Sequence, residues 1–271
     1  MSPNSRKRKT NPPRPSSPRL SARPLSRYHS PAPDSRLGRN LMTPPNLQNL
    51  RGKFLVFDGG EGCGKSTQAR LLREELERQN VPVLPVHDPG ATRIGEMIRE
   101  ILLDPRNTDM GMRCEMLLYM ASRAQMMVEK ILPALAAGQA VVSDRFVSST
   151  LAYQLGGDGL TADDIRTVAN IAIKSRWPDL TLILDMPVES SMARVRPKFT
   201  LFPDDPRAGM DLDRIEQRSL AYHDQVRKNY LEQVKADPKR YRVINADQPV
   251  EQVHADVLRA VGELGGARRK T

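Results

Sequence analysis

The sequence predicts an α/β fold in which a parallel β-sheet of about five strands is covered by helices on both faces. Two observations lead to this prediction. From residue 53 onward, short apolar runs alternate with longer stretches of helical periodicity, and a glycine-rich loop joins the first apolar run to the first helical stretch. Strands that alternate with helices pair in parallel, because a helix supplies the crossover between them.

The strands are expected where apolar and β-branched residues form short runs, at residues 53–57, 81–86, 140–143, 180–184 and 241–244. The helices are expected between and after these runs, at residues 65–78, 93–103, 112–135, 161–174, 214–235 and 250–262. In the first helix, Ala69, Leu72 and Leu76 recur at helical spacing and define one apolar face. Residues 51–271 are therefore expected to form one α/β domain.

Residues 1–50 form a basic tail that we expect to be disordered. The tail holds ten Lys or Arg residues, one acidic residue and ten of the 22 prolines. With few large apolar residues, such a segment buries too little surface to offset its conformational entropy. The tail carries +9 of the formal net charge of +10, which leaves +1 for residues 51–271. The basic character therefore belongs to the tail and not to the predicted domain.

Several interpretations of the tail stay open at this point. Its basic run Arg6-Lys7-Arg8-Lys9 suits a nuclear address or a nucleic-acid contact. Its Arg- and Ser-rich composition suits an organelle transit peptide, although the frequent prolines would break an amphipathic helix. Translation starting at Met42 would remove most of it. A nucleic-acid-binding NTPase driven by the tail is the alternative from another class, and the nearly neutral domain disfavours it.

Composition also bears on the compartment. No apolar run approaches the roughly 18 residues that a membrane-spanning helix needs, and no signal peptide is expected. The two cysteines, Cys63 and Cys114, are too few for a disulfide framework and are not spaced as a metal site. We therefore expect a cytoplasmic protein without a membrane segment.

The glycine-rich loop fits the pattern G-x-x-x-x-G-K-[ST] of a phosphate-binding P-loop, which predicts a P-loop NTPase fold. In such loops successive backbone N–H groups and the following helix N-terminus face an anion. Lys65 is expected to reach the β- and γ-phosphates of ATP. The predicted ATP-binding residues are those of the loop: Gly59, Gly60, Glu61, Gly62, Cys63, Gly64, Lys65, Ser66 and Thr67.

A Mg²⁺ ion is expected as the cofactor, with ATP as the phosphoryl donor. The Ser66 hydroxyl is one predicted ligand. Asp144 is the other, directly or through water, because it ends the apolar run 140–143 at the edge of the sheet where the P-loop lies. Asp185 follows the run 180–184 in the same way and is a rival for this role.

Five segments in order resemble the thymidylate kinase family. They are Phe57-Asp58 with the P-loop that follows, Asp88-Pro89-Gly90-Ala91-Thr92, residues 117–125 (LLYMASRAQ), residues 144–154 (DRFVSSTLAYQ) and residues 212–216 (LDRIE). The resemblance covers about residues 51–262. It implies phosphoryl transfer from ATP to dTMP, giving dTDP and ADP in pyrimidine deoxynucleotide synthesis, by a homodimer. It also favours Asp144 over Asp185, because Arg145 follows Asp144 and resembles the arginine that clamps the transferring phosphoryl group.

The resemblance implies a set of residues that bind dTMP. Arg123 resembles the thymine-binding arginine and Tyr119 the aromatic that stacks on the base, and their i,i+4 spacing places both on one helix face. Tyr153 resembles a ring that packs against the sugar at C2′, and Glu61 the acid that contacts the 3′-hydroxyl. The implied dTMP site comprises Glu61, Arg99, Tyr119, Arg123, Arg145, Ser149, Thr150, Tyr153 and Gln154.

The P-loop contains no arginine, although phosphoryl transfer needs cations around the developing charge. The segment of about residues 194–212 resembles the mobile lid of bacterial members, so Arg194 and Arg196 join Lys65, Arg145 and Glu61 as predicted catalytic residues. This segment is longer than is usual, which leaves the roles of Lys198 and Arg207 open. A P-loop kinase for another nucleotide or a deoxynucleoside remains the alternative function.

Overall fold

The sheet has five parallel strands, as the sequence predicts. The computed structural model describes residues 45–195 and 213–266. The strands are β1 (Phe54–Gly59), β2 (Val83–His87), β3 (Ala140–Asp144), β4 (Leu180–Asp185) and β5 (Tyr241–Asn245). They pair in the order β2-β3-β1-β4-β5. Because β1 lies between β3 and β4, the loop after β1 leaves from the centre of the carboxyl edge, where ligands bind in open α/β sheets.

Side chains of β1 alternate between two apolar cores, one on each face of the sheet. Leu55 and Phe57 pack into the core that also holds Leu72 of α1 (Lys65–Arg78) and Val257 of α9 (Val250–Gly266). Their neighbours Phe54 and Val56 pack into the opposite core. These four side chains are fully buried, as is usual for a central strand covered on both faces.

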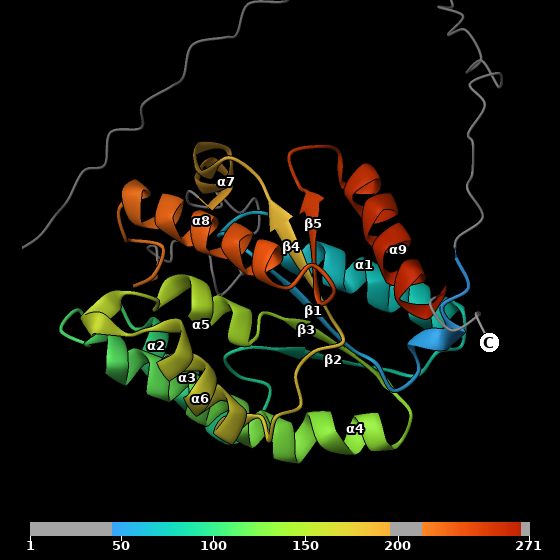
Figure 1. Ribbon diagram of the computed structural model, residues 1–271, viewed down its shortest axis with the longest axis horizontal. Helices are drawn as coiled ribbons and strands as arrows, with labels where there is room; N and C mark the ends of the chain where they lie inside the picture. The colour runs from blue at the N-terminus through green and yellow to red at the C-terminus, as the bar shows by residue number, and fades with distance from the viewer. Residues whose placement is uncertain (1–44, 196–212, 267–271) are drawn as a thin grey trace, which may run out of the picture. The chain divides into compact units, whose positions relative to one another are not determined.

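Helices α1 and α9 cover the face of the sheet that carries Leu55 and Phe57, and the longer of the other helices lie on the opposite side (Figure 1). The remaining α-helices are α2 (Arg93–Leu103), α3 (Met112–Met126), α4 (Leu132–Ala136), α5 (Val147–Tyr153), α6 (Ala162–Ala172), α7 (Val188–Val195) and α8 (Leu220–Ala236). The bounds of α1 and α2 are those predicted. Thr161, predicted as the first residue of α6, is instead its N-cap and forms a capping box with Asp164.

The single helix predicted at residues 112–135 is divided into three parts. A π-helical turn (Met127–Ile131) separates α3 from α4. Pro133 is in the first turn of α4. Proline has no backbone N–H, and its ring clashes with the carbonyl four residues earlier, so a regular α-helix cannot run through this point. Apolar periodicity continues through the turn, which is why the sequence indicated one helix.

One further helix prediction needs correction, and two helices were missed. The helix predicted from residue 214 begins only at Leu220, where Ser219 is the N-cap and accepts a hydrogen bond from the backbone of Tyr222. Helices α5 and α7 were not predicted. All seven residues of α5 are buried, including the polar Ser148, Ser149 and Thr150, so it shows no amphipathic pattern. Helix α7 has only eight residues, too short for a clear helical pattern.

The folded part of the chain begins before residue 51, so the boundary that we expected at residue 50 is too late. Leu47 and Leu50 are fully buried in the same core as Leu55 and Phe57. Leu50 ends a short 3₁₀ turn (Gln48–Leu50), and the backbone N–H of Leu47 donates to the side chain of Gln79 at the end of α1. The predicted disordered tail otherwise falls on residues 1–44, which lie outside the described residues.

Within the described residues, no helix combines the length and apolarity required to span a membrane.

Candidate functional site

A cavity of about 770 Å³ lies along the carboxyl edge of the sheet, between the P-loop and the ends of α2, α3 and α5. It is lined by most of the predicted site residues: Glu61, Gly62, Gly64, Lys65, Ser66, Thr67, Arg99, Tyr119, Arg123, Asp144, Arg145, Ser149, Thr150, Tyr153, Gln154 and Arg194. Gly59, Gly60 and Cys63 instead line a smaller space behind the loop. Arg196, Lys198 and Arg207 lie outside the described residues.

The P-loop takes a shape that side chains would prevent. Gly64 is the N-cap of α1 with φ of 91°, in the left-handed region that favours glycine, and no side chain caps the helix. The first N–H groups of α1 therefore remain available to an anion. At Gly62, where φ is 69°, a Cβ atom would overlap the carbonyl oxygen of Ser191 in α7. The close approach of α7 explains why this position carries no side chain.

Lys65 folds back onto the loop. Its Nζ donates to the carbonyl oxygen of Gly60 at 2.6 Å and lies 3.7 Å from Sγ of Cys63, and the residue is buried. Burial raises the pKa of the Cys63 thiol, and the Lys65 charge opposes this only in part. Cys63 therefore contributes packing beneath the loop, while Lys65 can exchange its carbonyl partner for a phosphate oxygen.

The two strand-end aspartates occupy different environments, and this distinguishes Asp144 from its rival. Asp144 Oδ2 accepts a hydrogen bond from Oγ of Ser66 at 2.5 Å, and both residues line the cavity. Asp185 instead accepts two bonds from Arg227, at 2.7 and 2.9 Å, and does not line that cavity. Asp144 and Ser66 thus offer adjacent oxygen ligands at the P-loop, the kind that Mg²⁺ prefers.

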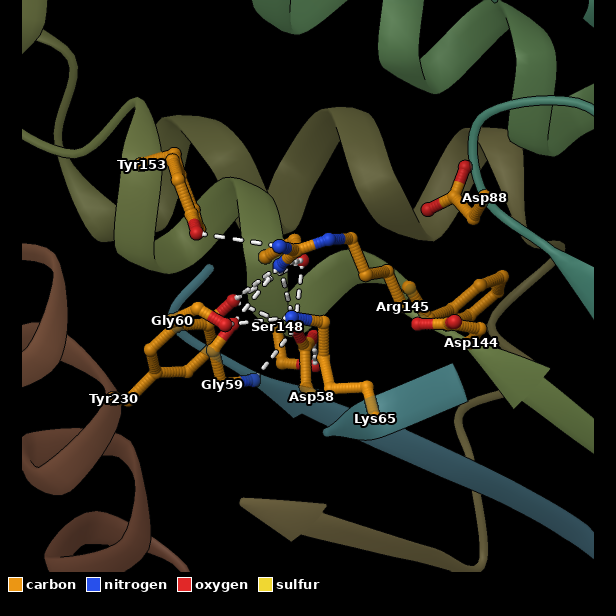
Figure 2. A network of polar contacts seen from close by, with 12 residues as sticks. Asp58, Gly59, Gly60, Lys65, Asp88, Asp144, Arg145, Ser148, Tyr153 and Tyr230 are labelled. Atoms are coloured by element: carbon orange, nitrogen blue, oxygen red, sulfur yellow. Dashed lines mark hydrogen bonds and ion pairs between the residues drawn. The ribbon is translucent and has the colours of Figure 1, made fainter. Parts of the chain in front are cut away.

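Arg145 extends across the cavity from a strained backbone. Its φ is 69°, unusual for a residue with a side chain, and its N–H donates to the Phe57 carbonyl oxygen at 2.8 Å. Its guanidinium donates to Glu61 Oε1 at 2.5 Å and to the Gly59 carbonyl oxygen at 3.0 Å. Its Cζ lies 5.2 Å from the centre of the Tyr153 ring. Figure 2 shows Arg145 between Tyr153 and the P-loop.

Glu61 is held as a charged acceptor on the wall of the cavity. Burial would raise its pKa, but the charges of Arg145 and Lys65 and hydrogen bonds from Tyr153 and Arg145 lower the pKa to about 2. Tyr153 Oη donates to Glu61 Oε1 at 2.8 Å. The sequence therefore predicted three residues that the structure brings into one contact network: Glu61, Arg145 and Tyr153.

Asp58 lies beneath this network and was not predicted as a site residue. It is fully buried, and it accepts hydrogen bonds from Ser148, Ser149 and Tyr230 at 2.6 to 2.7 Å. Arg145 contacts the same carboxylate at 3.4 Å, so Asp58 positions the guanidinium from below (Figure 2). A carboxylate at the end of an apolar strand is the signal that singled out Asp144, and it also applies to Asp58.

Arg123 is fully buried at the base of the cavity, where it forms an ion pair with Asp88. Its Nε donates to Asp88 Oδ2 at 2.6 Å, and its other nitrogens donate to Thr150 Oγ1 at 2.7 Å and to the Phe146 carbonyl oxygen at 2.9 Å. Its Cζ lies 5.5 Å from the Tyr119 ring centre, so the predicted pair shares one face of α3. Burial raises the pKa of Asp88, and Arg123 opposes this. Asp88 is a partner that the sequence did not indicate.

The remaining predicted residues contribute at the edges of the cavity. Arg99 of α2 donates to the Pro89 carbonyl oxygen at 2.9 Å, which holds it beside the loop after β2. Arg194, in the last turn of α7, is half exposed and lies 3.9 Å from Asp247. Gln154 follows α5 and donates to Glu115, a buried residue of α3 that was not predicted. Glu115 precedes Tyr119 and Arg123 by one and two helical turns, a spacing that could have indicated it.

These features together define a P-loop phosphotransferase site. The P-loop lies at the centre of a parallel sheet, the Ser66 hydroxyl and the Asp144 carboxylate lie beside it, and Arg145 faces the other half of the cavity. Comparisons with known proteins specify the family. The family model described as thymidylate kinase matches residues 57–257. The chain belongs to the thymidylate kinase family.

Individual relatives agree with this assignment. A thymidylate kinase of Caldanaerobacter subterraneus subsp. tengcongensis is 42% identical over 220 residues, which cover 81% of this chain and 100% of the relative. One of Pseudomonas savastanoi pv. phaseolicola is 41% identical with the same coverage. The crystal structure of thymidylate kinase from Ehrlichia chaffeensis matches with a TM-score of 0.59 and 27% identity, covering 77% of this chain and 97% of that one.

Proposed function

We propose that this chain transfers the γ-phosphoryl group of ATP to dTMP, giving ADP and dTDP. The observation that carries the proposal is the Arg145–Glu61 pair, which stands between the P-loop and the wall formed by Tyr119, Arg123 and Tyr153. A cation at this point can contact a donor phosphate from the loop and an acceptor phosphate from the opposite half. Kinases that lower the barrier chiefly by positioning and charge need such a group.

The roles of the individual side chains follow from their positions. Lys65 binds the β- and γ-phosphates of ATP with the N–H groups of the loop. Arg145 holds the acceptor phosphate and the transferring group, and Arg99 assists it from α2. Glu61 accepts a hydrogen bond from the sugar, which fits a carboxylate that stays ionised. Arg194, with Arg196 outside the described residues, supplies further positive charge.

The base lies on the wall formed by α3 and α5 in this proposal. Tyr119 stacks on the thymine, and Arg123 and Thr150 contact its edge, while Ser149 and Gln154 lie beside them. Arg123 already uses most of its N–H groups within the protein. The side chain is therefore rigid before the nucleotide binds, which reduces the entropy lost on binding.

The reaction uses Mg²⁺, with Ser66 and Asp144 as its protein ligands. No group of three or more His, Cys, Asp or Glu residues within the described segments could form an all-protein metal site. Two protein oxygens beside the P-loop suffice, because water and phosphate oxygens supply the other ligands of Mg²⁺ in kinases. Asp144→Asn should therefore raise the Mg²⁺ concentration needed for half-maximal activity. Asp185→Asn, which breaks the Arg227 pair, should leave it unchanged.

The protein acts as a cytoplasmic homodimer that pairs through α2 and α3. Ile94, Met97 and Ile101 form an exposed apolar row on α2, and Leu117 is exposed on α3, which packs against α2. An apolar row of this kind is usually covered by a partner. Met97→Glu should lower the mass measured by light scattering from that of a dimer to that of a monomer, and an unchanged mass would exclude this face.

The decisive experiment is an acceptor panel with ATP and Mg²⁺. We expect dTMP to be phosphorylated with the highest kcat/KM among the nucleoside monophosphates, and deoxynucleosides not to be phosphorylated. Faster turnover of another nucleotide, or of a deoxynucleoside, would replace the acceptor while keeping the P-loop kinase class.

A further inference from the structure

Glu115 is a fully buried carboxylate that accepts hydrogen bonds from three side chains of other segments. Its Oε2 accepts from Arg214 at 2.5 Å and from Arg218 at 2.7 Å. Its Oε1 accepts from Nε2 of Gln154 at 2.5 Å. Arg214 also donates to the Leu102 carbonyl oxygen of α2 at 3.0 Å. The cluster therefore connects the ends of α2 and α5 with the segment that precedes α8.

This arrangement determines which end of the Gln154 amide faces the cavity. A carboxylate accepts hydrogen bonds and cannot donate them, so it selects the NH₂ end of the amide. The Gln154 oxygen is directed away from Glu115 and accepts no hydrogen bond from a described residue. Because Gln154 lines the cavity, its oxygen is offered there as an acceptor.

The Gln154 side-chain oxygen, as a hydrogen-bond acceptor, can distinguish one pyrimidine base from another. Thymine and uracil carry an N–H group at ring position 3, whereas cytosine carries an unprotonated nitrogen there. Gln154 directly follows α5, whose residues Thr150 and Tyr153 line the same wall. A buried acceptor that meets a ring N–H gains a hydrogen bond, and one that meets a lone pair is left unsatisfied.

We propose that Glu115 is a positioning residue for base specificity: it fixes Gln154 with its oxygen toward the cavity and so selects bases with an N–H at position 3. This inference rests on the proposed acceptor and extends it to a residue that does not itself touch the nucleotide. The two arginines take the opposite carboxylate oxygen, so Glu115 cannot turn away from Gln154 without losing them.

Glu115→Gln tests the proposal because it changes one atom of the carboxylate. The new amide must keep its oxygen toward Arg214 and Arg218, which only donate, so its NH₂ group faces Gln154. Gln154 then reverses and presents its own NH₂ group to the cavity. We expect the ratio of kcat/KM for dTMP over dCMP to fall by at least about tenfold, with dUMP reduced in parallel with dTMP.

The double variant Glu115→Gln with Gln154→Glu restores an acceptor. The amide at 115 would donate to a carboxylate at 154, whose second oxygen faces the cavity, and the dTMP preference should return. Gln154→Leu is an independent variant that leaves the Glu115 ion pairs in place, and it should bring the ratio toward one. Glu129→Gln is the matched control, since exposed Glu129 accepts from Gln125 at 3.0 Å in a similar pair, and its ratio should not change.

Turnover and melting curves are measured for every variant with dTMP, dUMP and dCMP. A lowered melting temperature with an unchanged dTMP:dCMP ratio in Glu115→Gln would overturn the proposal and leave Glu115 a packing residue. If Glu115→Gln does not fold, an unchanged ratio in Gln154→Leu overturns it equally. The proposed function is tested separately by the wild-type protein: absence of dTMP turnover there would refute the acceptor and not the hydrogen-bond arrangement.

Discussion

Replacing Tyr153 by alanine should reduce stability and sugar discrimination together, whereas phenylalanine should separate the two effects. The ring of Tyr153 is buried, and it packs edge-on against Tyr222 and Tyr230 with centroid distances of 6.3 and 6.1 Å. Removing a buried aromatic ring costs about 3–5 kcal/mol. For a domain of this size that corresponds to a decrease in Tm of roughly 6–20 °C.

The sugar effect follows from the implied position of the ring against C2′. A rigid ring there excludes a ribose hydroxyl by overlap, and burying an unpaired hydroxyl adds about 1–3 kcal/mol. The wild-type protein should therefore prefer dTMP over its ribose counterpart by at least about tenfold to a hundredfold in kcat/KM. Tyr153→Ala should lose most of this preference, because the space beside C2′ opens.

Tyr153→Phe is the control that keeps the ring. It removes only the hydroxyl, which donates to Glu61 at 2.8 Å, so the deoxy/ribo ratio should persist while kcat falls. Both nucleotides are assayed for each variant beside a melting curve. An unchanged deoxy/ribo ratio in Tyr153→Ala, with a lowered Tm, would show that the ring only packs the core and does not gate the sugar.

The remaining predictions concern the donor site, the chain start and acid stability. Lys65→Met should reduce kcat by orders of magnitude while Tm stays near that of the wild type, and near-normal turnover would remove the loop from the donor site. A chain starting at Met42 should keep its Tm and activity. A chain starting at Arg51 should melt at a lower temperature, because it lacks the buried leucines of residues 45–50. Equal Tm values for the two chains would exclude packing of this segment. The pKa of Glu61 is about 2 in the folded chain against an ordinary value of 4.5, so its contribution to stability is present above pH 4.5 and lost as the pH falls toward 2. Urea unfolding between pH 6 and 3 should show a shallower loss of stability in Glu61→Gln than in the wild type, and parallel curves would contradict the assigned environment.

Local patterns were sufficient for the elements whose signals are short-range. The P-loop, the predicted bounds of α1 and α2, and all five strands follow from runs and spacings within a few residues of one another. Local patterns failed for α5, where every residue is buried, and for the π-helical turn before α4, where the apolar periodicity continues through a change in the backbone. The start of the folded part was also missed, because Leu47 and Leu50 are isolated in a polar segment and only the core identifies them.

The same division applies to the site. The sequence by itself predicted the chemistry. Motif spacing, which follows from local backbone geometry, indicated a phosphate loop with Lys65 and Ser66 and an acidic strand end followed by Arg145, and the family resemblance implied the residue types of an acceptor wall. Only the tertiary structure decided the partners. It pairs Asp185 with Arg227 and leaves Asp144 to Ser66, and it joins Glu115 to Gln154. These contacts bring together residues far apart in the chain, and their energies depend on burial and distance, which no local pattern records.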